Sequence, residues 1–497
     1  MNLKLFALSV MLLMFSNAAF PQQIKGQIID AKTNETIAFA TVQFDDDHGV
    51  VSNMEGYFSF SLDQLNIEKP LIISFMGYQT QNLTIKDLEA KNYIIKLNEA
   101  VNQLKTVYLT NKVPSVDSIM ARVNRNLNKN YNFSNLKYTL FSRETVFFKA
   151  NDLEVDIEKS SNFSKKKLDA SNNQFKELAN QIVNNPPTQT FTDALTELYL
   201  KPDFKGKMEV KQATKLKDRK NSLSLETIQS RVTNIILQHL DSSKTYKVKT
   251  GWFKVEDSMS LKKSKKEEKE IDDNSFDELK STNINSISEH LFESQSKLDF
   301  VKDIDGYDYE LSNITAIDDQ LVYVITFKPR KNRTKFMGTL YINGIDYAIQ
   351  KLDYSFAQGK IGEKLNLKLI LGIKYVENVN KGTVIYKKNS DDTCYYPYYI
   401  NSESGRYVYL HRPFKFIENS DDSNNKVAFD ITIEGSIIEK HEQMTLDNQV
   451  SSDDTFKALV EAKKIDFIQL KQYDSSIWKE YSILEPLEEL KKFKVEE

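Results

Sequence analysis

Short segments that alternate apolar and polar residues follow one another from residue 24 onward. Gly56 to Ser61 alternates aromatic with small or polar side chains, which is the period of a half-buried strand. Leu71 to Phe75 is a nearly continuous apolar run that suits the centre of a sheet, and Tyr93 to Leu97 closes the series. Six or seven short strands separated by turns predict a β-sandwich over residues 24–110.

Apolar residues spaced three and four apart mark helices further along the chain. The spacing predicts three helices, around residues 116–127, 175–183 and 228–240. Ser115 stands where the first helix needs an N-cap, and Pro186 stands just beyond the second helix, where a helix must end. This part of the chain therefore mixes helices with strands.

Long apolar and aromatic stretches with turn residues between them dominate from Leu321 onward. The expected strands are residues 321–327, 336–342, 347–356, 365–376, 395–400, 406–410 and 427–438. Their succession predicts an antiparallel meander, long enough to curl around a helix or an apolar cavity. The fold class is mainly β with some helices: an N-terminal β-sandwich, then a larger α+β domain with a long, antiparallel, curved sheet.

The chain behind the sandwich is expected to form one domain. Residues 111–300 supply the mixed helix and strand region, with strand character at 138–149, and residues 301–497 supply the antiparallel β-rich region with a helix near 455–465. The block 262–273, KKSKKEEKEIDD, carries both signs of charge within twelve residues. Such a block predicts a solvated loop or a frayed helix.

The first nineteen residues have the three parts of a secretory signal. A short basic start precedes an apolar run from Leu5 to Phe15, and small residues end at Ala18 and Ala19. A signal peptide over residues 1–19 predicts an exported protein in the periplasm, at the periphery of the outer membrane or on the cell surface. The alternative is a buried N-terminal helix. No later apolar run approaches the about 20 residues of a transmembrane helix.

Composition narrows this picture. The 497 residues suffice for two to four domains. The 67 basic and 70 acidic residues nearly balance, which gives no reason to expect nucleic acid as a partner. The 29 Phe and 24 Tyr favour strands. Cys394 is the only cysteine, so the chain folds without an internal disulfide, and we expect this thiol to be a small buried apolar group.

Four motifs occur in one order within the predicted sandwich. They are Gly26 to Asp30, Ile37 to Val42, Ser52 to Phe58 and Ile73 to Tyr78. Together they resemble the carboxypeptidase-D regulatory-like family, which is common in exported proteins of the Bacteroidota. Met54-Glu55 stands where that family usually has an acidic residue followed by Asp. The resemblance implies a transthyretin-like accessory domain and no peptidase activity, and Gly56 and Gly77 are expected to serve the backbone only.

The strands from Tyr323 to Ile349 are similar in pattern to the LolA-like half-barrel. That resemblance implies a site for lipid or lipoprotein acyl chains. The alternative is an ordinary strongly curved sheet with a filled core. Tyr395, Tyr396, Tyr398 and Tyr399 surround Pro397 and form either an aromatic binding surface or packing within a strand.

A search for catalytic motifs finds none complete, so we expect no catalytic residues and no cofactor. His441-Glu442 begins a zincin-like motif, but Thr445 stands where the second histidine is required. His290 and Glu293 form an H-x-x-E pair, and His411 follows downstream, which is the ligand order of zinc carboxypeptidases. The expected meander between them does not suit such an enzyme, so a metal site at His290, Glu293 and His411 remains a minor alternative.

Two short patterns fit the acceptor site of periplasmic O-glycosylation. They are Asp117-Ser118-Ile119 and Asp257-Ser258-Met259. Ser118 falls inside a predicted helix, which makes Ser258 the better candidate.

Three functions remain open on the sequence. The first is a non-enzymatic envelope protein, with an accessory sandwich and a β-rich domain that binds a protein, glycan or lipid partner, peripheral association with the outer membrane included. The second is a zinc-dependent, carboxypeptidase-like hydrolase. The third is a periplasmic carrier of lipid or lipoprotein.

Overall fold

A computed structural model describes residues 23–44, 48–62, 69–100, 113–161, 163–217, 240, 243–250, 253–260, 275–292, 296–317, 320–389, 393–419 and 425–495. The chain divides into two compact units. The smaller unit comprises Met1–Val101 with Asp474–Leu487, and the larger unit comprises Asn102–Tyr473 with Glu488–Glu497. The signal peptide expected at residues 1–19 and the charged block at 262–273 lie outside the described residues, as does nearly all of the helix expected at 228–240.

The smaller unit contains two sheets, which confirms the sandwich. One sheet has the order β4-β1-β7 and the other β3-β2-β5-β6. The strands are β1 (Gln23–Asp30), β2 (Thr41–Gln43), β3 (Gly49–Val51), β4 (Tyr57–Ser61), β5 (Leu71–Ser74), β6 (Gln81–Leu83) and β7 (Ile94–Leu97), with helix α2 (Ile85–Ala90) before β7. Ile28, Val42, Phe58 and Ile73 are fully buried, as their alternation with polar residues requires.

Several residues of the family-like motifs meet in this unit. The Asp30 carboxylate accepts the backbone N–H groups of Lys32 and Thr33, both at 2.7 Å, and the hydroxyl of Tyr78 at 2.8 Å. The Thr33 N–H and the Tyr78 hydroxyl lower the pKa of Asp30 to about 2, while burial and this same hydrogen bond raise the pKa of Tyr78 to about 12. The hydrogen bond from Tyr78 to Asp30 thus joins the last of the four motifs to the first, at the turn that follows Asp30.

Gly56 and Gly77 both have left-handed backbones, with φ of +75° and +87°. An added Cβ at Gly56 would meet the Ile28 carbonyl oxygen at 2.7 Å, whereas at Gly77 nothing lies within 4 Å. Gly77→Ala is therefore expected to lower the free energy of unfolding of the sandwich by about 1–2 kcal/mol through backbone strain alone. Gly56→Ala is expected to cost more, because the clash adds to the same strain. Hydrogen exchange of β1 amides in the full chain measures both, and an equal loss would contradict the clash.

The C-terminal segment Asp474–Leu487 belongs to the sandwich unit, which the sequence did not indicate. The prediction that residues 301–497 form a single region with 111–300 is therefore wrong for this segment. Trp478, in the turn η4 (Ser475–Trp478), is fully buried. The Asn53 side-chain amide donates to the Glu485 carbonyl at 3.2 Å, and Lys25 pairs with the Glu485 carboxylate at 3.6 Å. These contacts join residues more than 400 positions apart, beyond the reach of any periodicity.

Among the residues that the structure describes, the larger unit is built on one sheet of 14 strands, in the order β13-β14-β15-β16-β18-β19-β20-β8-β9-β10-β21 along its main path. Its strands are β8 (Leu136–Ser160), β9 (Thr188–Leu200), β10 (Gly206–Lys217), β11 (Thr245–Thr250), β12 (Phe253–Ser260), β13 (Tyr307–Ile317), β14 (Gln320–Pro329), β15 (Phe336–Asn343), β16 (Ile349–Phe356), β17 (Lys364–Leu367), β18 (Ile373–Lys388), β19 (Tyr395–Glu418), β20 (Lys426–Val450) and β21 (Ile468–Leu470). β20 pairs with β8, so strands from before and after residue 300 share the sheet. The expected meander corresponds to β14 through β20, and β13 adds an antiparallel strand before it that the sequence pattern did not predict.

Several strands differ from their predicted bounds. Residues 395–400 and 406–410, expected as separate strands, lie in the 24-residue strand β19. Residues 365–376, expected as one strand, form a hairpin in which the helical turn α9 (Lys368–Leu371) and Gly372, at φ +63°, reverse the chain. The helix expected near 455–465 is shorter, α10 (Asp453–Ala458). These bounds were mispredicted because a polar residue within a strand and a turn residue between two strands interrupt an apolar run in the same way.

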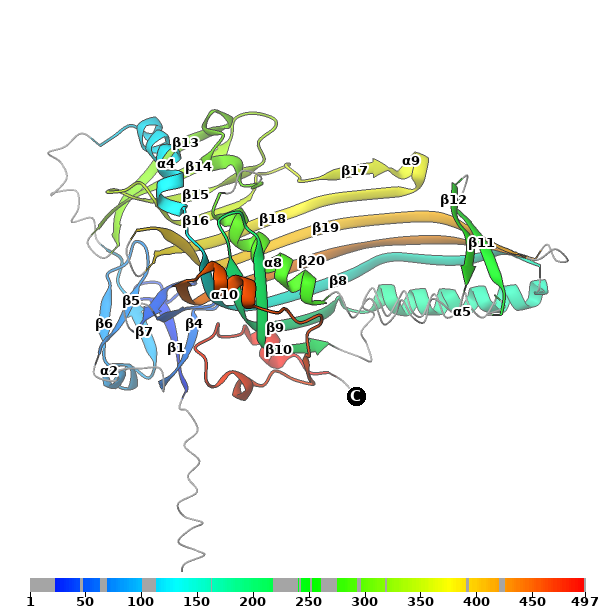
Figure 1. The fold of residues 1–497 in the computed structure, drawn as a ribbon, viewed down its shortest axis with the longest axis horizontal. Helices are drawn as coiled ribbons and strands as arrows, with labels where there is room; N and C mark the ends of the chain where they lie inside the picture. Colours follow the sequence, from blue (N-terminus) through cyan, green and yellow to red (C-terminus); the bar gives the residue numbers. More distant parts are fainter. Residues whose placement is uncertain are drawn as a thin grey trace, which may run out of the picture. The chain divides into compact units, whose positions relative to one another are not determined.

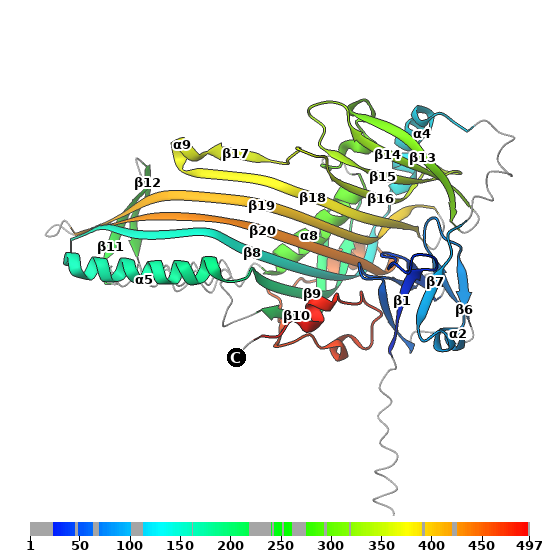
Figure 2. The ribbon, with the colours of Figure 1, turned by 180° about the vertical axis from the view of Figure 1, so that it is seen from behind.

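Helices cover one face of this sheet, which we call the helix face. α4 (Val116–Tyr131) begins at the Ser115 cap as expected and buries Ile119 and Val123 in the main core. α5 (Lys165–Asn184) packs along β8 and β20 (Figure 1), and α8 (Ser275–His290) packs nearer the core. Figure 2 shows the long strands β18, β19, β20 and β8 side by side.

Candidate functional site

A cavity of about 770 Å³ lies between α8 and the helix face of the large sheet. Most of its lining side chains are polar or charged. They come from the sheet (Glu144, Tyr354, Asn380, Ser402, Glu403, Ser404, Glu439 and His441), from α8 (Thr282, Ile284, Asn285, Ser286, Ser288, Glu289 and His290) and from neighbouring segments (Asp203, Phe204, Ser296, Lys297 and Leu298). All of them belong to the larger unit.

Strand register explains why the sheet wall of this cavity is polar. His441 pairs with Ser402 on β19 and with Glu144 on β8, so these three side chains form one row across the helix face. Ser404 and Glu439 form the next row. Because side chains alternate between faces along a strand, a residue at every second position of three adjacent strands meets the same cavity.

His290 lies at the end of α8 and is 3% exposed. Its Nδ1 lies 2.7 Å from the Ser286 carbonyl oxygen, which must accept a hydrogen. This places the proton on Nδ1 and leaves Nε2 to accept from the Tyr354 hydroxyl at 3.3 Å. Burial, together with the nearby His441, lowers the pKa of His290 to about 4. The imidazole is therefore neutral at pH 7.

His441 faces His290 from the opposite wall. Burial lowers its pKa to about 4 as well. Its Nε2 lies 3.4 Å from the Gln443 side-chain oxygen, while no described residue bonds to the buried Nδ1. The buried hydroxyl of Ser286 likewise has no partner among the residues that the structure describes. Buried polar atoms ordinarily have partners, so these two leave hydrogen-bonding capacity to a molecule inside the cavity.

Carboxylates give the cavity an acidic character. Burial raises the pKa of Glu144, and the facing Glu439 raises it further. Burial also raises the pKa of Glu289. Glu439 forms an ion pair with Arg406, one row further along the helix face.

Beyond Arg406 the helix face changes from polar to apolar. Leu365, Tyr375 and Val408 form one row across β17, β18 and β19. Leu367, Ile373, Leu410 and Ile433 form the next, and Ile433 packs against the cluster beneath α5. We call these two rows the apolar rows. The same face therefore carries a polar cavity and an apolar surface separated by one row.

The structure does not bring the candidate zinc ligands together. His290 lines the cavity, Glu293 lies outside the described residues, and His411 lies nine residues along β19 from Ser402. Nine residues of strand correspond to about 30 Å and to the opposite face. The described residues contain no group of three or more His, Cys, Asp or Glu side chains placed to hold a metal ion.

The two candidate acceptor serines lie apart. Ser118 lies in the first turn of α4, half-buried, and its N–H is bonded to the Ser115 cap at 3.3 Å. Ser258 is exposed on β12, so its hydroxyl is the accessible one.

The tyrosines around Pro397 pack within the protein. Tyr395, Tyr398 and Tyr399 are nearly fully buried, so the packing alternative holds for them. Cys394 is half-buried rather than fully buried, with its Sγ 3.8 Å from the Lys129 carbonyl oxygen.

A buried ion pair lies on the other face of the large sheet. The Arg143 guanidinium donates to the Asp193 carboxylate through Nε at 2.8 Å and Nη2 at 2.7 Å, and both side chains are nearly inaccessible. The Glu442 carboxylate, whose pKa is raised by burial, lies nearby and accepts the Tyr399 hydroxyl at 3.0 Å. This pair joins β8 to β9.

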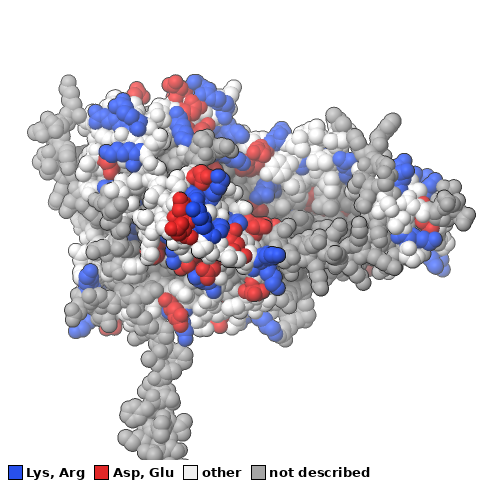
Figure 3. Space-filling model, viewed as in Figure 1, with Lys and Arg blue, Asp and Glu red and all other residues white. Residues whose placement is uncertain are grey.

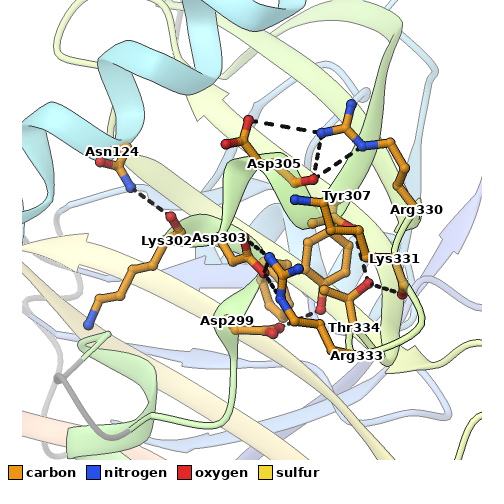
Figure 4. Close-up of polar contacts among 12 residues, drawn as sticks. Asn124, Asp299, Lys302, Asp303, Asp305, Tyr307, Arg330, Lys331, Arg333 and Thr334 are labelled. Carbon is orange, nitrogen blue, oxygen red and sulfur yellow. Dashed lines mark hydrogen bonds and ion pairs between the residues drawn. The ribbon is translucent and has the colours of Figure 1, made fainter.

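A second polar cluster ties the turns η2 (Asp299–Val301) and η3 (Ile304–Gly306) to the β14–β15 turn (Figure 4). The Arg333 guanidinium donates to the Asp303 carboxylate at 2.6 to 3.1 Å, and the Tyr307 hydroxyl donates to Asp299. Because the Arg333 guanidinium meets a carboxylate and the Arg330 guanidinium meets the Asp305 carbonyl oxygen, the cluster serves to fasten these turns.

Sequence patterns alone did not identify the cavity residues. In the sequence, His441 stands out only through an incomplete zincin-like motif, and His290 only through a candidate metal site that the fold does not assemble. Ser402, Ser404 and Glu439 carry no motif. The one usable signal was polar residues at alternate positions of long apolar strands, a pattern that also describes an ordinary solvent-facing strand.

Comparisons with known proteins agree with the smaller unit's motifs. Residues 24–109 match the CarboxypepD_reg-like domain family. No curated protein matches the chain. A LolA superfamily protein from Nitrosomonas europaea shares 10% identity over 69% of this chain and 98% of its own, with a TM-score of 0.18. A DUF1329 family protein from Desulfovibrio piger shares 8% identity over 64% of this chain and 92% of its own, also at 0.18. Such scores bear on neither ligand nor activity.

Charge and helix length add two observations. Lys and Arg lie beside Asp and Glu over the centre of the view in Figure 3, in keeping with a net charge of −3. Among the described residues, no helix is both long and apolar enough to cross a membrane.

Proposed function

We propose that the chain is a non-enzymatic, exported envelope protein whose larger unit binds a polar ligand, a glycan in the first instance, in the cavity beneath α8. The main observation in support is the cavity itself, which is lined on both walls by carboxylate, imidazole, amide and hydroxyl groups. The sandwich acts as an accessory module, as its CarboxypepD_reg-like match suggests.

The lining chemistry favours hydroxyl-rich ligands. Glu144 and Glu439 offer acceptors for sugar hydroxyls, and Ser286 and His441 offer the buried groups that no described residue satisfies. Tyr354 and Phe204 supply ring surfaces. A few polar groups converging beside aromatic rings in a cavity of this volume are typical of small-molecule sites.

The non-enzymatic part of the proposal is supported by side-chain placement. Among the described contacts, the ring nitrogens of His290 and His441 meet the Tyr354 hydroxyl and the oxygens of Ser286 and Gln443, and no serine hydroxyl or thiol in the geometry of a triad. The carboxypeptidase-like alternative needs His411 beside His290, and the register of β19 separates them.

Calorimetric titration of the full mature chain with a panel of soluble oligosaccharides tests the proposal. We expect at least one oligosaccharide to bind, and Ser404→Trp, which fills the cavity, to weaken that binding at least about tenfold. Ser436→Trp is the matched control, because Ser436 pairs with Tyr407 on the opposite face of the same strands. Binding that survives Ser404→Trp, or a panel that gives no binding, would reject the glycan site.

A carrier of amphiphilic lipid is the second candidate, favoured by the apolar rows beside the polar cavity. In this arrangement the headgroup occupies the cavity and the acyl chain covers Val408 and Leu410. To test whether the protein carries lipid, it is purified from native membranes, and the extracted lipid is analysed by mass spectrometry. Lipid that is present in wild type and reduced in Leu410→Ser supports the carrier, whereas protein free of lipid counts against it.

A further inference from the structure

The β17–β18 hairpin carries an unusual exposed sequence. Residues 364–376, KLNLKLILGIKYV, contain four leucines and three lysines and no acidic residue. We call this segment the leucine hairpin. Leu369 is 101% exposed and Leu365 is 46% exposed. Other strongly exposed apolar residues of the larger unit, such as Ile345 and Val460, stand singly.

The hairpin holds Leu369 in place. Gly372 is left-handed, and an added Cβ there would lie 1.9 Å from the His411 carbonyl oxygen. The His411 N–H donates to the Gly372 carbonyl at 2.7 Å, which fixes the turn to β19. A fully exposed leucine on a turn that is bonded to a long strand is presented outward and gains nothing from the fold of this chain.

The lysines of the hairpin are held by aromatic rings. The Lys368 ammonium lies 3.8 Å from the centroid of the Tyr409 ring, and the Lys374 ammonium lies 4.9 Å from that of Tyr407. Cation–π contacts of this kind keep both charges beside the apolar tip. Lysines and tyrosines next to exposed leucines are the composition of an interfacial membrane anchor.

The two flanking acids are both paired with other groups of the protein. The Glu363 carboxylate is exposed but forms an ion pair with Lys297 at 3.3 Å. Glu377 is nearly buried and accepts the Glu363 N–H at 3.0 Å and the Asn380 amide at 3.2 Å. The hairpin therefore presents positive charge only, which complements an anionic surface.

We propose that the leucine hairpin is a docking point for an anionic lipid bilayer, into which Leu369 inserts while Lys364, Lys368 and Lys374 contact headgroup phosphates. A bilayer fits better than a protein partner, because the tip is a protruding apolar turn and a fluid acyl phase needs no matching cavity. The inference is independent of what the cavity binds and adds a membrane surface as partner.

Flotation of the full mature chain with vesicles tests this. Vesicles of phosphatidylglycerol and phosphatidylethanolamine are compared with vesicles of phosphatidylcholine alone. We expect binding to the anionic vesicles only. Leu369→Ser should weaken it about tenfold, and each of Lys364→Gln and Lys368→Gln about fivefold. Ile345→Ser is the matched control: Ile345 is 73% exposed in another turn of the same unit, beside Asp346, and its loss should leave binding unchanged.

Fluorescence gives a readout that does not depend on affinity. In Leu369→Trp, the new tryptophan should shift to shorter wavelength with anionic vesicles and be quenched by brominated acyl chains. The proposal is overturned if the wild-type chain does not float, if Leu369→Ser floats as well as wild type, or if Ile345→Ser loses as much. It is also overturned if the hairpin instead mediates concentration-dependent self-association that Leu369→Ser abolishes without any vesicle binding.

Discussion

Replacing Arg143 by methionine is expected to lower the free energy of unfolding of the larger unit by about 3–5 kcal/mol, the largest single effect predicted for this chain. Arg143 and Asp193 are each 3% exposed and are joined by two hydrogen bonds. Removing the guanidinium leaves the Asp193 carboxylate buried without its counter-charge. The nearby carboxylate of Glu442 adds to the unfavourable field.

A double variant distinguishes the effect of the unpaired charge from simple loss of packing. Arg143→Met with Asp193→Leu removes both charges and keeps apolar volume, so most of the lost stability should return. Arg330→Met is the matched control, because Arg330 is 49% exposed and pairs with Asp305 at 3.9 Å, a contact worth about 0–1 kcal/mol.

Hydrogen exchange of β8 and β9 amides during urea titration of the full chain measures these differences in the larger unit itself. A single variant no less stable than Arg330→Met would show that Arg143 and Asp193 are not a buried pair. A double variant as unstable as the single one would show that packing, and not charge, is what Arg143 contributes.

Acidification from pH 7 to pH 5 is expected to destabilise the larger unit by about 2 kcal/mol through His290 alone. Burial lowers the pKa of His290 from 6.5 to about 4 in the folded chain. In the unfolded chain, His290 therefore binds a proton below about pH 6.5. In the folded chain it does so only below about pH 4. Stability rises with pH across this window and is lost as pH falls through it. His441, with its pKa lowered to about 4, acts in the same direction.

Both histidines face several titratable groups. Glu144 and Glu439 contribute from the sheet and Glu289 from α8, while Tyr354 bonds to the His290 ring. Since burial raises the pKa of Glu144 and Glu289, these acids also take up protons on acidification. The difference between histidine variants, rather than the whole pH profile, therefore isolates the imidazoles.

This comparison measures the free energy of unfolding of wild type, His290→Gln and His411→Gln at pH 7 and pH 5. Hydrogen exchange of β20 amides is the readout. His290→Gln should lose about 2 kcal/mol less on acidification than wild type. His411→Gln is the control, because that side chain is 45% exposed and does not line the cavity. An identical pH response in wild type and His290→Gln would contradict a buried neutral imidazole.

Local features of this chain were readable from the sequence alone. Alternation predicted the sandwich strands, and their motifs matched the same residues that the CarboxypepD_reg-like family covers. Spacings of three and four predicted α4 and α5, with Ser115 at the cap. The mainly β class and the antiparallel meander followed in the same way. Each depends on neighbours within a few residues, where side-chain direction is set by the backbone period.

Other features were decided only by the tertiary structure. The fusion of residues 395–410 into β19, the hairpin at Gly372 and the return of Asp474–Leu487 to the sandwich have no local signature. The cavity has none either: His290 and His441 are 151 positions apart, and the sheet wall that faces α8 forms only because β20, β19 and β8 align at one register. A shift of one residue would turn His441 to the other face, so pairing between distant strands, and not the pattern along any one of them, makes the site.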